Sequence, residues 1–402
     1  MQKPPGKVAG DAAELLPASQ SEVGRIHKYI ALAYAAKIKL YQAYQQDETT
    51  HAVTSINKEL LREVVSLCDQ VTASNRYGLL DDFQGLDLVA NENGKESVFA
   101  IQYSMNDGTE SAGRINWSNL LNSPGGGSPY GGDGFFLPSQ DLINAYQTDA
   151  NGLPDFNYQS KSDYSWAVLN NGVYTLQNTT PNVDPRLDFV VGRPTITWKT
   201  YPDKPCEGWV RDKETYGYNC AKRFWVSPES SDMFNGWPWG ASQLNWQIIR
   251  YADILLWKAE ALIELNEGDG LETARDLINQ IRNRARNSAY VKDFNDHSKY
   301  AANYLVNPYP ADVWNQDYAR QALRWETRLE KALEGERFFD LVRWGIVETT
   351  MNKYITAESD NRIYYANAHF TGGKDEYYPV PNNQYGFSGG KYVQNPGYAP
   401  FN

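Results

Sequence analysis

The sequence is poor in the residues that metal sites and nucleic-acid interfaces use most. It has only 3 cysteines and 4 histidines in 402 residues, which argues against a protein with several zinc sites. Lys and Arg number 38 against 49 Asp and Glu, so the formal net charge is −11 and no basic face for nucleic acid is expected. No apolar run approaches the roughly 18 to 20 residues that a membrane-spanning helix needs. We therefore expect no nucleic-acid partner.

Motifs of catalysis are scarce as well. A G-x-S-x-G pattern at residues 386–390 would need a histidine base downstream of Ser388, but the last histidine is His369. The glycine-rich residues 125–132 lack the lysine of a phosphate-binding loop. We therefore predict that the protein is not an enzyme. Because 49 carboxylates leave many acid and base pairs open, a helical glycoside hydrolase of the (α/α) type is the enzymatic alternative.

One short segment resembles part of a calcium-binding loop. Asp149, Asn151 and Asp155 are spaced like oxygen ligands, but the glycine of the segment, Gly152, is not at the sixth position from Asp149. We expect no metal and no other cofactor, and a single opportunistic Ca²⁺ is the one exception that the sequence leaves open.

Aromatic side chains are what the sequence has in abundance. There are 28 Tyr, 14 Phe and 12 Trp, or 13% of the chain. Tyr and Trp enter a core only where their polar tips find a partner, so this many of them favours aromatic surfaces in contact with water. Such surfaces bind sugars or proteins. The alternative is that these side chains pack at the rims of helices.

Two pairs of amphipathic helices are predicted, one at the start of the chain and one that begins near residue 250. Apolar residues recur every three or four positions in four segments, at residues 26–41, 53–71, 248–262 and 271–285. Such pairs are typical of tetratricopeptide-like repeats, so a helical-repeat scaffold that binds protein and no sugar is a further alternative. Two more helices are predicted over residues 318–333 and 338–350.

The middle of the chain has a different composition. Residues 104–240 are rich in Gly, Pro, Asn and Asp as well as aromatics, and they show little periodicity. Short strands are predicted at residues 97–103 and 195–201, and the remainder is predicted to form long ordered loops, which tend to carry function. The tail, residues 361–402, is also predicted to be loop, because its Tyr-Pro and Asn-Pro steps disfavour helix.

Several stretches resemble, in the same order along the chain, the motifs of one protein family. They are LP…GR at residues 16–25, ESVFAIQY at 96–103, DPRL at 184–187, RYADILLWKAEA at 250–261, ARDLINQIRNRA at 274–285, RLEKALEGERFFDLVRWG at 328–345, YPVP at 378–381 and QNPGY at 394–398. Together they resemble the SusD/RagB family of Bacteroidetes outer-membrane lipoproteins, which bind glycans and other nutrients. The stretch at residues 328–345 is the longest and the most specific.

The resemblance implies a fold and a division of the chain. The fold is mostly α and SusD-like, with tetratricopeptide-like helix pairs and a large loop-rich region that contains a few short strands. We expect one domain over residues 1–402. Its parts are an N-terminal helical pair at residues 1–95, a loop-rich ligand-binding region at 96–245, and C-terminal helices with a tail at 246–402.

The resemblance also implies a function. It indicates a cell-surface protein of polysaccharide utilization, which captures an oligosaccharide or another nutrient and delivers it to a SusC-like TonB-dependent transporter. We therefore expect a surface-exposed lipoprotein of the outer membrane. Family members begin with a lipoprotein signal, a lipidated cysteine and a further helical stretch. The printed sequence shows none of these, so we expect it to be a fragment, and a divergent member of the family is the alternative.

The candidate sugar-binding residues are aromatics of the loop-rich region. A sugar ring offers an apolar C–H face that stacks on an aromatic ring, and a polar edge that bonds Asn, Gln, Asp and Arg. Trp257, Trp325 and Trp344 fall in predicted helices and are expected in the core. The candidates are Trp117, Tyr130, Trp198, Trp209, Tyr216, Tyr218, Trp237 and Trp239.

Two of the three cysteines fall in the same loop-rich region. Cys206 and Cys220 are 14 positions apart, and a disulfide closing a loop of this length would contribute about 3 kcal/mol. Such a bridge requires an oxidising compartment, and the sequence leaves both the bridged and the reduced form open. Cys68 lies beside Leu67 on a predicted helical stripe and is expected to be a buried thiol.

The charged residues of the 328–345 stretch are expected to serve the fold rather than a ligand site. Glu330, Glu334 and Arg337 are spaced by four and three positions, so on one helix they would share a face and pair. Gly345 follows Arg343 and Trp344 and is a predicted helix C-cap.

Overall fold

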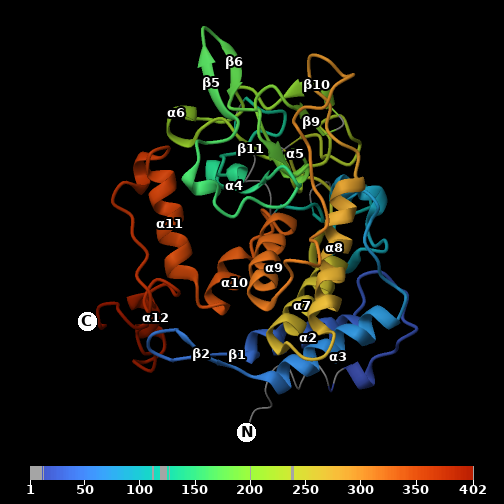
Figure 1. Cartoon of the computed structure of the whole chain (residues 1–402), viewed down its shortest axis with the longest axis vertical. Coiled ribbons are helices and arrows are strands. Elements are labelled where there is room, and N and C mark those ends of the chain that lie inside the picture. Colours follow the sequence, from blue (N-terminus) through green and yellow to red (C-terminus); the bar gives the residue numbers. More distant parts are fainter. Residues whose placement is uncertain are drawn as a thin grey trace.

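The computed structural model describes residues 11, 13–110, 113–117, 125, 127–199, 201–236 and 240–401, and Figure 1 shows their arrangement. Helices dominate, and within this part of the chain the strands form two-stranded pairs rather than a larger sheet. The prediction of a mostly α fold with a few short strands is confirmed. The described helices include none with the length and apolarity needed to span a bilayer.

The helices fall into three groups along the chain. The N-terminal group consists of α2 Lys28–Ala43 and α3 Lys58–Ala73. In the middle of the chain the described helices are short, α4 Gln140–Ala145, α5 Arg186–Val190 and α6 Lys213–Tyr216. The C-terminal group consists of α7 Tyr251–Leu265, α8 Gly270–Asn287, α9 Gln316–Glu330, α10 Arg337–Arg343, α11 Val347–Ser359 and α12 Asn382–Phe387. Short 3-10 turns are η1 Phe83–Asp87, η2 Val89–Asn91, η4 Tyr158–Ser160 and η5 Ile363–Tyr365.

The strands are short and pair antiparallel. The pairs are β1 Tyr44–Gln46 with β2 Val53–Ile56, β3 Ser97–Ile101 with β12 Trp246–Arg250, β4 Gln147–Thr148 with β7 Asn182–Val183, β5 Trp166–Asn170 with β6 Val173–Gln177, β8 Val191–Gly192 with β11 Cys220–Ala221, and β9 Thr197–Trp198 with β10 Tyr201–Pro205. Because β12 runs directly into α7, its pairing with β3 ties the two halves of the chain together.

The helices α2, α3, α7, α8 and α9 pack around the larger hydrophobic core. α2 contributes small, fully buried side chains, Ala33, Ala35 and Ala36, which let its neighbours approach closely. α7 is buried along nearly its whole length, so it is the central helix of the group. The two predicted helix pairs are confirmed, and Cys68 on α3 is the buried free thiol that was expected.

Some predicted helix boundaries are wrong for local reasons. Val53 and Ile56 lie on β2, because the chain turns back on β1 before the second helix begins. Asn57 then caps α3, since its side chain accepts the Leu60 backbone N–H at 3.2 Å. In the same way Ile248 belongs to β12, and α7 begins only at its end.

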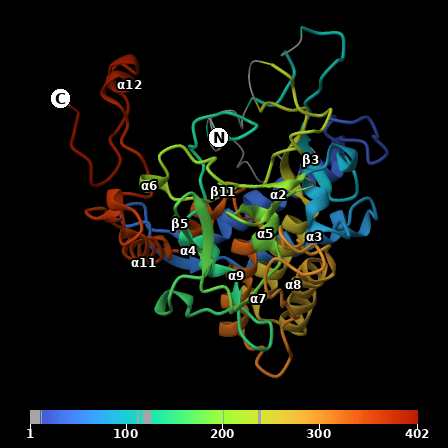
Figure 2. The ribbon, with the colours of Figure 1, turned by 90° about the horizontal axis from the view of Figure 1, so that it is seen from above.

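The C-terminal part is more divided than predicted. The helix expected over residues 338–350 is split into α10 and α11. The break lies at Gly345, whose φ of 66° suits the C-cap glycine that the sequence predicted. The tail was expected to be loop throughout, but it contains the short helix α12, and Figure 2 shows this part extending away from the helices.

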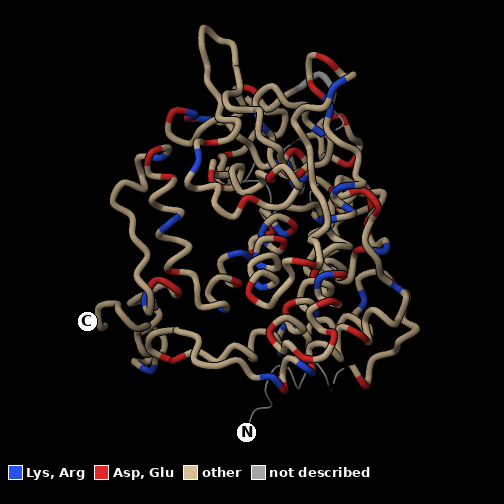
Figure 3. The backbone as a smooth tube through the Cα atoms, viewed as in Figure 1, with Lys and Arg blue, Asp and Glu red and all other residues tan. Residues whose placement is uncertain are grey.

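A buried network of ion pairs links the sequence motifs from the two halves of the chain. Glu330, at the end of α9, binds Arg250 at 3.0 Å, Arg186 at 3.2 Å, and also Arg284. Glu96 binds Arg250 at 2.7 Å and Arg284 at 3.1 Å. Figure 3 shows charges of both signs gathered on α9 and its neighbours. The charged motif residues therefore join helices to one another inside the protein.

Glu330, Glu334 and Arg337 do not pair with one another as predicted. α9 ends at Glu330, so the three residues do not share one helical face. Glu334 instead binds Arg250 Nη2 at 2.7 Å, and Arg337 Nη1 donates to the backbone carbonyl of Arg324 at 3.3 Å. Their structural role is as expected, but the partners are distant in the sequence.

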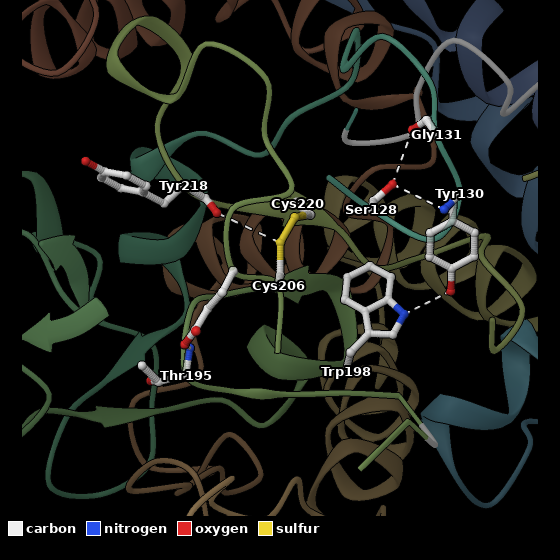
Figure 4. Close-up of a disulfide and its surroundings, with 9 residues drawn as sticks. Ser128, Tyr130, Gly131, Thr195, Trp198, Cys206, Tyr218 and Cys220 are labelled. Carbon is white, nitrogen blue, oxygen red and sulfur yellow. Dashed lines mark hydrogen bonds between the residues drawn. A yellow bond between two sulfur atoms is a disulfide. The ribbon is translucent and has the colours of Figure 1, made fainter. Parts of the chain in front are cut away.

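The loop-rich region contains a small aromatic core around a disulfide, which Figure 4 shows in close-up. Cys206 and Cys220 are bonded to each other. The indole N–H of Trp198 donates to the Tyr130 hydroxyl at 3.0 Å, and the rings of Trp198 and Trp209 lie 4.9 Å apart, edge to face. Since this region has little regular secondary structure, the bridge and the aromatic cluster hold its loops in place.

Candidate functional site

Three of the predicted sugar-binding aromatics lie in the core. Tyr130 and Trp198 have no exposed surface, and Trp209 is 5% exposed. The Tyr130 hydroxyl donates to the Val226 carbonyl at 2.7 Å, which accounts for its burial. A ring without an exposed face cannot stack on a sugar, so the structure corrects this prediction. These three side chains pack the loops around the disulfide, and Figure 4 shows Tyr130 and Trp198 beside it.

Trp117 is exposed, at 47%. The backbone N–H of its neighbour Asn116 donates to the Ser242 carbonyl at 2.8 Å, so the two segments lie side by side. Trp237 and Trp239 lie outside the described residues. Sugar binding by these three tryptophans stays a prediction.

Tyr216 and Tyr218 lie where the loop-rich region meets the C-terminal helices. Tyr216 is the last residue of α6 and is 47% exposed, while Tyr218 is half-buried. Figure 1 shows α6 above the end of α11. We name the group around them the tyrosine surface, which consists of Tyr174, Tyr216, Tyr218, Tyr354, Tyr364 and Tyr365.

The rings of the tyrosine surface come from three separate parts of the chain. Tyr218 packs edge to face on Tyr174 of β6, with ring centroids 5.6 Å apart. Tyr216 lies 6.0 Å from Tyr364, which follows α11 and is 50% exposed. Tyr216 and Tyr364 therefore offer two neighbouring rings to the solvent.

Contacts below these rings fix the segment after α6 against the segment after α11. Gly217 has a φ of 78°, and the Arg362 guanidinium lies so close that a side chain at position 217 would clash with it. Tyr365 packs on Tyr364 at 4.6 Å, and its hydroxyl forms a 3.1 Å hydrogen bond with that of Tyr354. The exposed pair thus rests on a half-buried base.

Polar groups surround the rings. Arg362 Nη1 donates to the Asn361 carbonyl at 2.8 Å, and the Asn361 amide donates to Asp163 at 3.2 Å. Glu358 is buried, and its Oε1 accepts the backbone N–H of Asp141 at 2.5 Å. Burial raises the pKa of Glu358 to about 7, with Asp141 and Asp163 adding to the rise. Aromatic faces beside guanidinium, amide and carboxylate groups are the chemistry that recognises a sugar ring.

Four members of this group were missed by the sequence analysis. Tyr174 lies on a strand, whereas Tyr354, Tyr364 and Tyr365 lie on or after a helix that the sequence predicted only in part. Tyr354, Tyr364 and Tyr365 also lie outside the predicted ligand-binding region, residues 96–245. Tyr364 and Tyr365 are adjacent in the sequence, in a segment that also contains Asn361, Arg362 and Asn367. This pair of aromatics is a local signal that could have indicated this part of the tail.

The calcium-like segment folds as a turn closed by its own atoms. Asp149 Oδ1 accepts the backbone N–H groups of Asn151 at 2.8 Å and of Leu153 at 2.9 Å. Asp155 pairs with Lys161. Among the described residues no group of three or more His, Cys, Asp or Glu side chains is arranged to hold a metal ion.

The fold and the tyrosine surface define a helical protein with an aromatic face suited to binding. The SusD family matches residues 95–398, well over half of the chain. The chain belongs to the SusD family, which confirms the resemblance seen in its motifs. The family is one of glycan-binding proteins rather than enzymes. A comparison with curated protein sequences found no match.

Solved structures share the fold. A SusD superfamily protein from Bacteroides vulgatus is 21% identical, with a TM-score of 0.61 over 94% of this chain and 64% of its own. A SusD-like carbohydrate-binding protein from Bacteroides fragilis is 20% identical, with a TM-score of 0.58 over 86% of this chain and 58% of its own. Surface glycan-binding protein A from Bacteroides thetaiotaomicron, solved with laminarihexaose, is 17% identical, with a TM-score of 0.56 over 97% of this chain and 69% of its own.

These similarities concern the fold, and each relative is longer than the matched part. The chain spans between 58% and 69% of the length of the three solved relatives. The second and third are named for binding carbohydrate or glycan.

Proposed function

We propose that this protein binds a glycan without cleaving it, and that the tyrosine surface is part of its binding site. The observation that carries the proposal is the pair of exposed rings, Tyr216 and Tyr364, 6.0 Å apart beside Arg362. Membership of the SusD family supports the choice of a glycan as ligand.

Binding at this surface needs no cofactor. The rings of Tyr216 and Tyr364 cover the C–H faces of the sugar, and hydroxyl groups at the sugar edge bond the phenol, guanidinium and amide groups nearby. Stacking of this kind excludes water from the hydrogen bonds at the rim of the contact, which strengthens them. The arrangement holds a ligand and supplies no step of chemistry.

We further propose that the bound glycan is delivered to a SusC-like TonB-dependent transporter at the outer membrane, with the protein exposed at the cell surface as a lipoprotein. The family supports this assignment. The disulfide of Cys206 and Cys220 is consistent with a location outside the reducing cytoplasm.

The test is affinity electrophoresis of the purified protein through gels that contain one polysaccharide each, with a reducing-end assay on the same mixtures. We expect one neutral polysaccharide to retard the protein and no new reducing ends to appear. Release of reducing ends would show the glycoside hydrolase instead. If no polysaccharide retards the protein, glycan binding is contradicted and a helical scaffold that binds only protein becomes the better account.

A further inference from the structure

A second aromatic site shares no residue with the tyrosine surface. It is a cavity of about 740 Å³, within the range of ligand pockets. Its walls come from the α2–β1 junction, from α10, and from the tail at residues 375–378 and Tyr398. We name it the tail pocket.

The rings of the tail pocket are unusually open to solvent for apolar groups. Phe339 of α10 is 59% exposed, Tyr377 is 48% exposed and Tyr378 is 91% exposed. Phe338 and Tyr41 line the same cavity and are half-buried. Adjacent exposed apolar rings around a cavity mark a binding surface rather than ordinary scattered exposure.

The charges at its walls disfavour anionic ligands in this pocket. Asp375 and Glu376 line it. The positive charge of Arg343 at its wall is already compensated, since Arg343 is buried and binds Glu260 and, at 2.8 Å, Asp340. A uronate or a sulfated sugar would therefore meet the Glu376 carboxylate, the Asp375 carboxylate that Lys374 partly compensates at 3.5 Å, and no free cation at these walls.

The positions that a cationic ligand would take are filled by the chain itself. The Arg343 guanidinium lies 4.8 Å from the Tyr41 ring and 5.2 Å from the Tyr44 ring. The Lys374 ammonium lies 5.1 Å from the Tyr398 ring and 3.5 Å from the Asp375 carboxylate. Since both cation–π positions are occupied, the rings left to a ligand are those of Phe338, Phe339, Tyr377 and Tyr378.

We propose that the tail pocket is a second carbohydrate-binding site, which takes neutral hexose units of the same polysaccharide that the tyrosine surface binds. Open aromatic faces serve the C–H side of the sugar. The Gln46 amide, whose Nε2 is held by the Val342 carbonyl at 2.7 Å, and the phenol hydroxyls of Tyr377 and Tyr378 serve its hydroxyl groups. The proposal rests on the proposed function for the class of ligand. Two sites on one molecule raise the avidity for a long repeating chain above the affinity of either site.

The test is hydroxyl-radical footprinting of the whole chain with mass spectrometry, in separate saturating solutions of maltohexaose, cellohexaose and laminarihexaose. We expect one hexaose to slow the oxidation of Phe339, Tyr377 and Tyr378 as well as that of Tyr216 and Tyr364. Slower oxidation at Tyr216 and Tyr364 alone overturns the second site and leaves the proposed function standing. No change at either group for any of the three sugars contradicts both. A further outcome is that the pocket residues are shielded from oxidation without sugar, and more strongly at higher protein concentration. This result would show that a second copy of the chain covers the pocket, and it would overturn the second site.

A pair of variants adds an affinity readout. Phe339→Ala with Tyr378→Ala removes two exposed rings, so the fold should persist, as its thermal unfolding would show. We expect this double variant to bind the long polysaccharide roughly tenfold more weakly, while a hexaose still protects Tyr216. Tyr300→Ala, an exposed tyrosine of the loop after α8, is the matched control and should bind like the wild type. Equal polysaccharide affinity of all three proteins would overturn the proposal.

Discussion

Trp198 shows what the buried aromatics do. It has no exposed surface, donates its indole N–H to Tyr130 at 3.0 Å and packs against Trp209. We predict that Trp198→Ala lowers the free energy of unfolding by about 3 to 5 kcal/mol, because it leaves a cavity and removes the hydrogen bond that the Tyr130 hydroxyl accepts from the indole. Urea denaturation measures this loss. The folded fraction of the variant should keep the glycan affinity of the wild type. A loss of affinity without a loss of stability would contradict the assignment of Trp198 to the core.

Glu358 makes the stability depend on pH. Burial raises its pKa from 4.5 to about 7, so between these values the unfolded chain loses this proton while the folded chain keeps it. The contribution of Glu358 is therefore most favourable below pH 4.5 and falls as the pH rises towards 7. We predict that Glu358→Gln, which keeps an oxygen for the Asp141 N–H, gains stability over the wild type from pH 4.5 to 8, by about 3 kcal/mol in all. Urea midpoints across this range measure it, and a constant difference would contradict it.

At the scale of elements, the ion pairs around Glu330 hold α9 against α8, β12 and α5. Burial alone would raise the pKa of Glu330, but Arg284, Arg250 and Arg186 lower it to about 2. The stabilisation is therefore fully present above pH 4.5 and is lost as the pH falls towards 2. We predict that Glu330→Gln costs about 3 to 5 kcal/mol at pH 7, because three guanidinium groups lose their shared partner.

The control for Glu330 is Glu348→Gln, on the exposed side of α11. This variant should follow the pH profile of the wild type, whereas the deficit of Glu330→Gln should shrink as the pH is lowered from 4.5. Acid unfolding curves decide between these outcomes. If the loss of stability in Glu330→Gln stays the same down to pH 2, Glu330 is not ionised in the folded protein and the prediction is wrong.

The disulfide acts on the loop-rich element between β10 and β11. We predict that the double substitution Cys206→Ser and Cys220→Ser lowers the free energy of unfolding by about 3 kcal/mol. A thiol reductant should lower the stability of the wild type by a similar amount and should leave the double variant unchanged. An effect of the reductant on both proteins, or on neither, would contradict a stabilising bridge.

At the scale of the whole molecule, the sequence predicts what is local and misses what is assembled over distance. The pairs α2–α3 and α7–α8 could be predicted because each helix repeats its apolar residues within its own length. The partners of Glu330 could not, because Arg186, Arg250 and Arg284 come next to it only once the chain has folded.

The candidate site follows the same rule. Tyr216 and Tyr218 were found from loop composition, but composition carries no information on burial, so it also selected Tyr130, Trp198 and Trp209 from the core. The tyrosine surface is made of strand, loop and helix segments that no single pattern connects. Family motifs did not point to it either, because their charged residues lie inside the protein.

The most direct test of glycan binding at the tyrosine surface is one titration series. Oligosaccharides cut from the polysaccharide that retards the protein are titrated calorimetrically into the wild type, into the double variant Tyr216→Ala with Tyr364→Ala, and into Tyr300→Ala. The loss of two stacking rings should weaken binding by the double variant at least roughly tenfold, equivalent to about 1.4 kcal/mol, while Tyr300→Ala binds like the wild type. Equal dissociation constants for all three proteins would contradict a glycan site at Tyr216 and Tyr364.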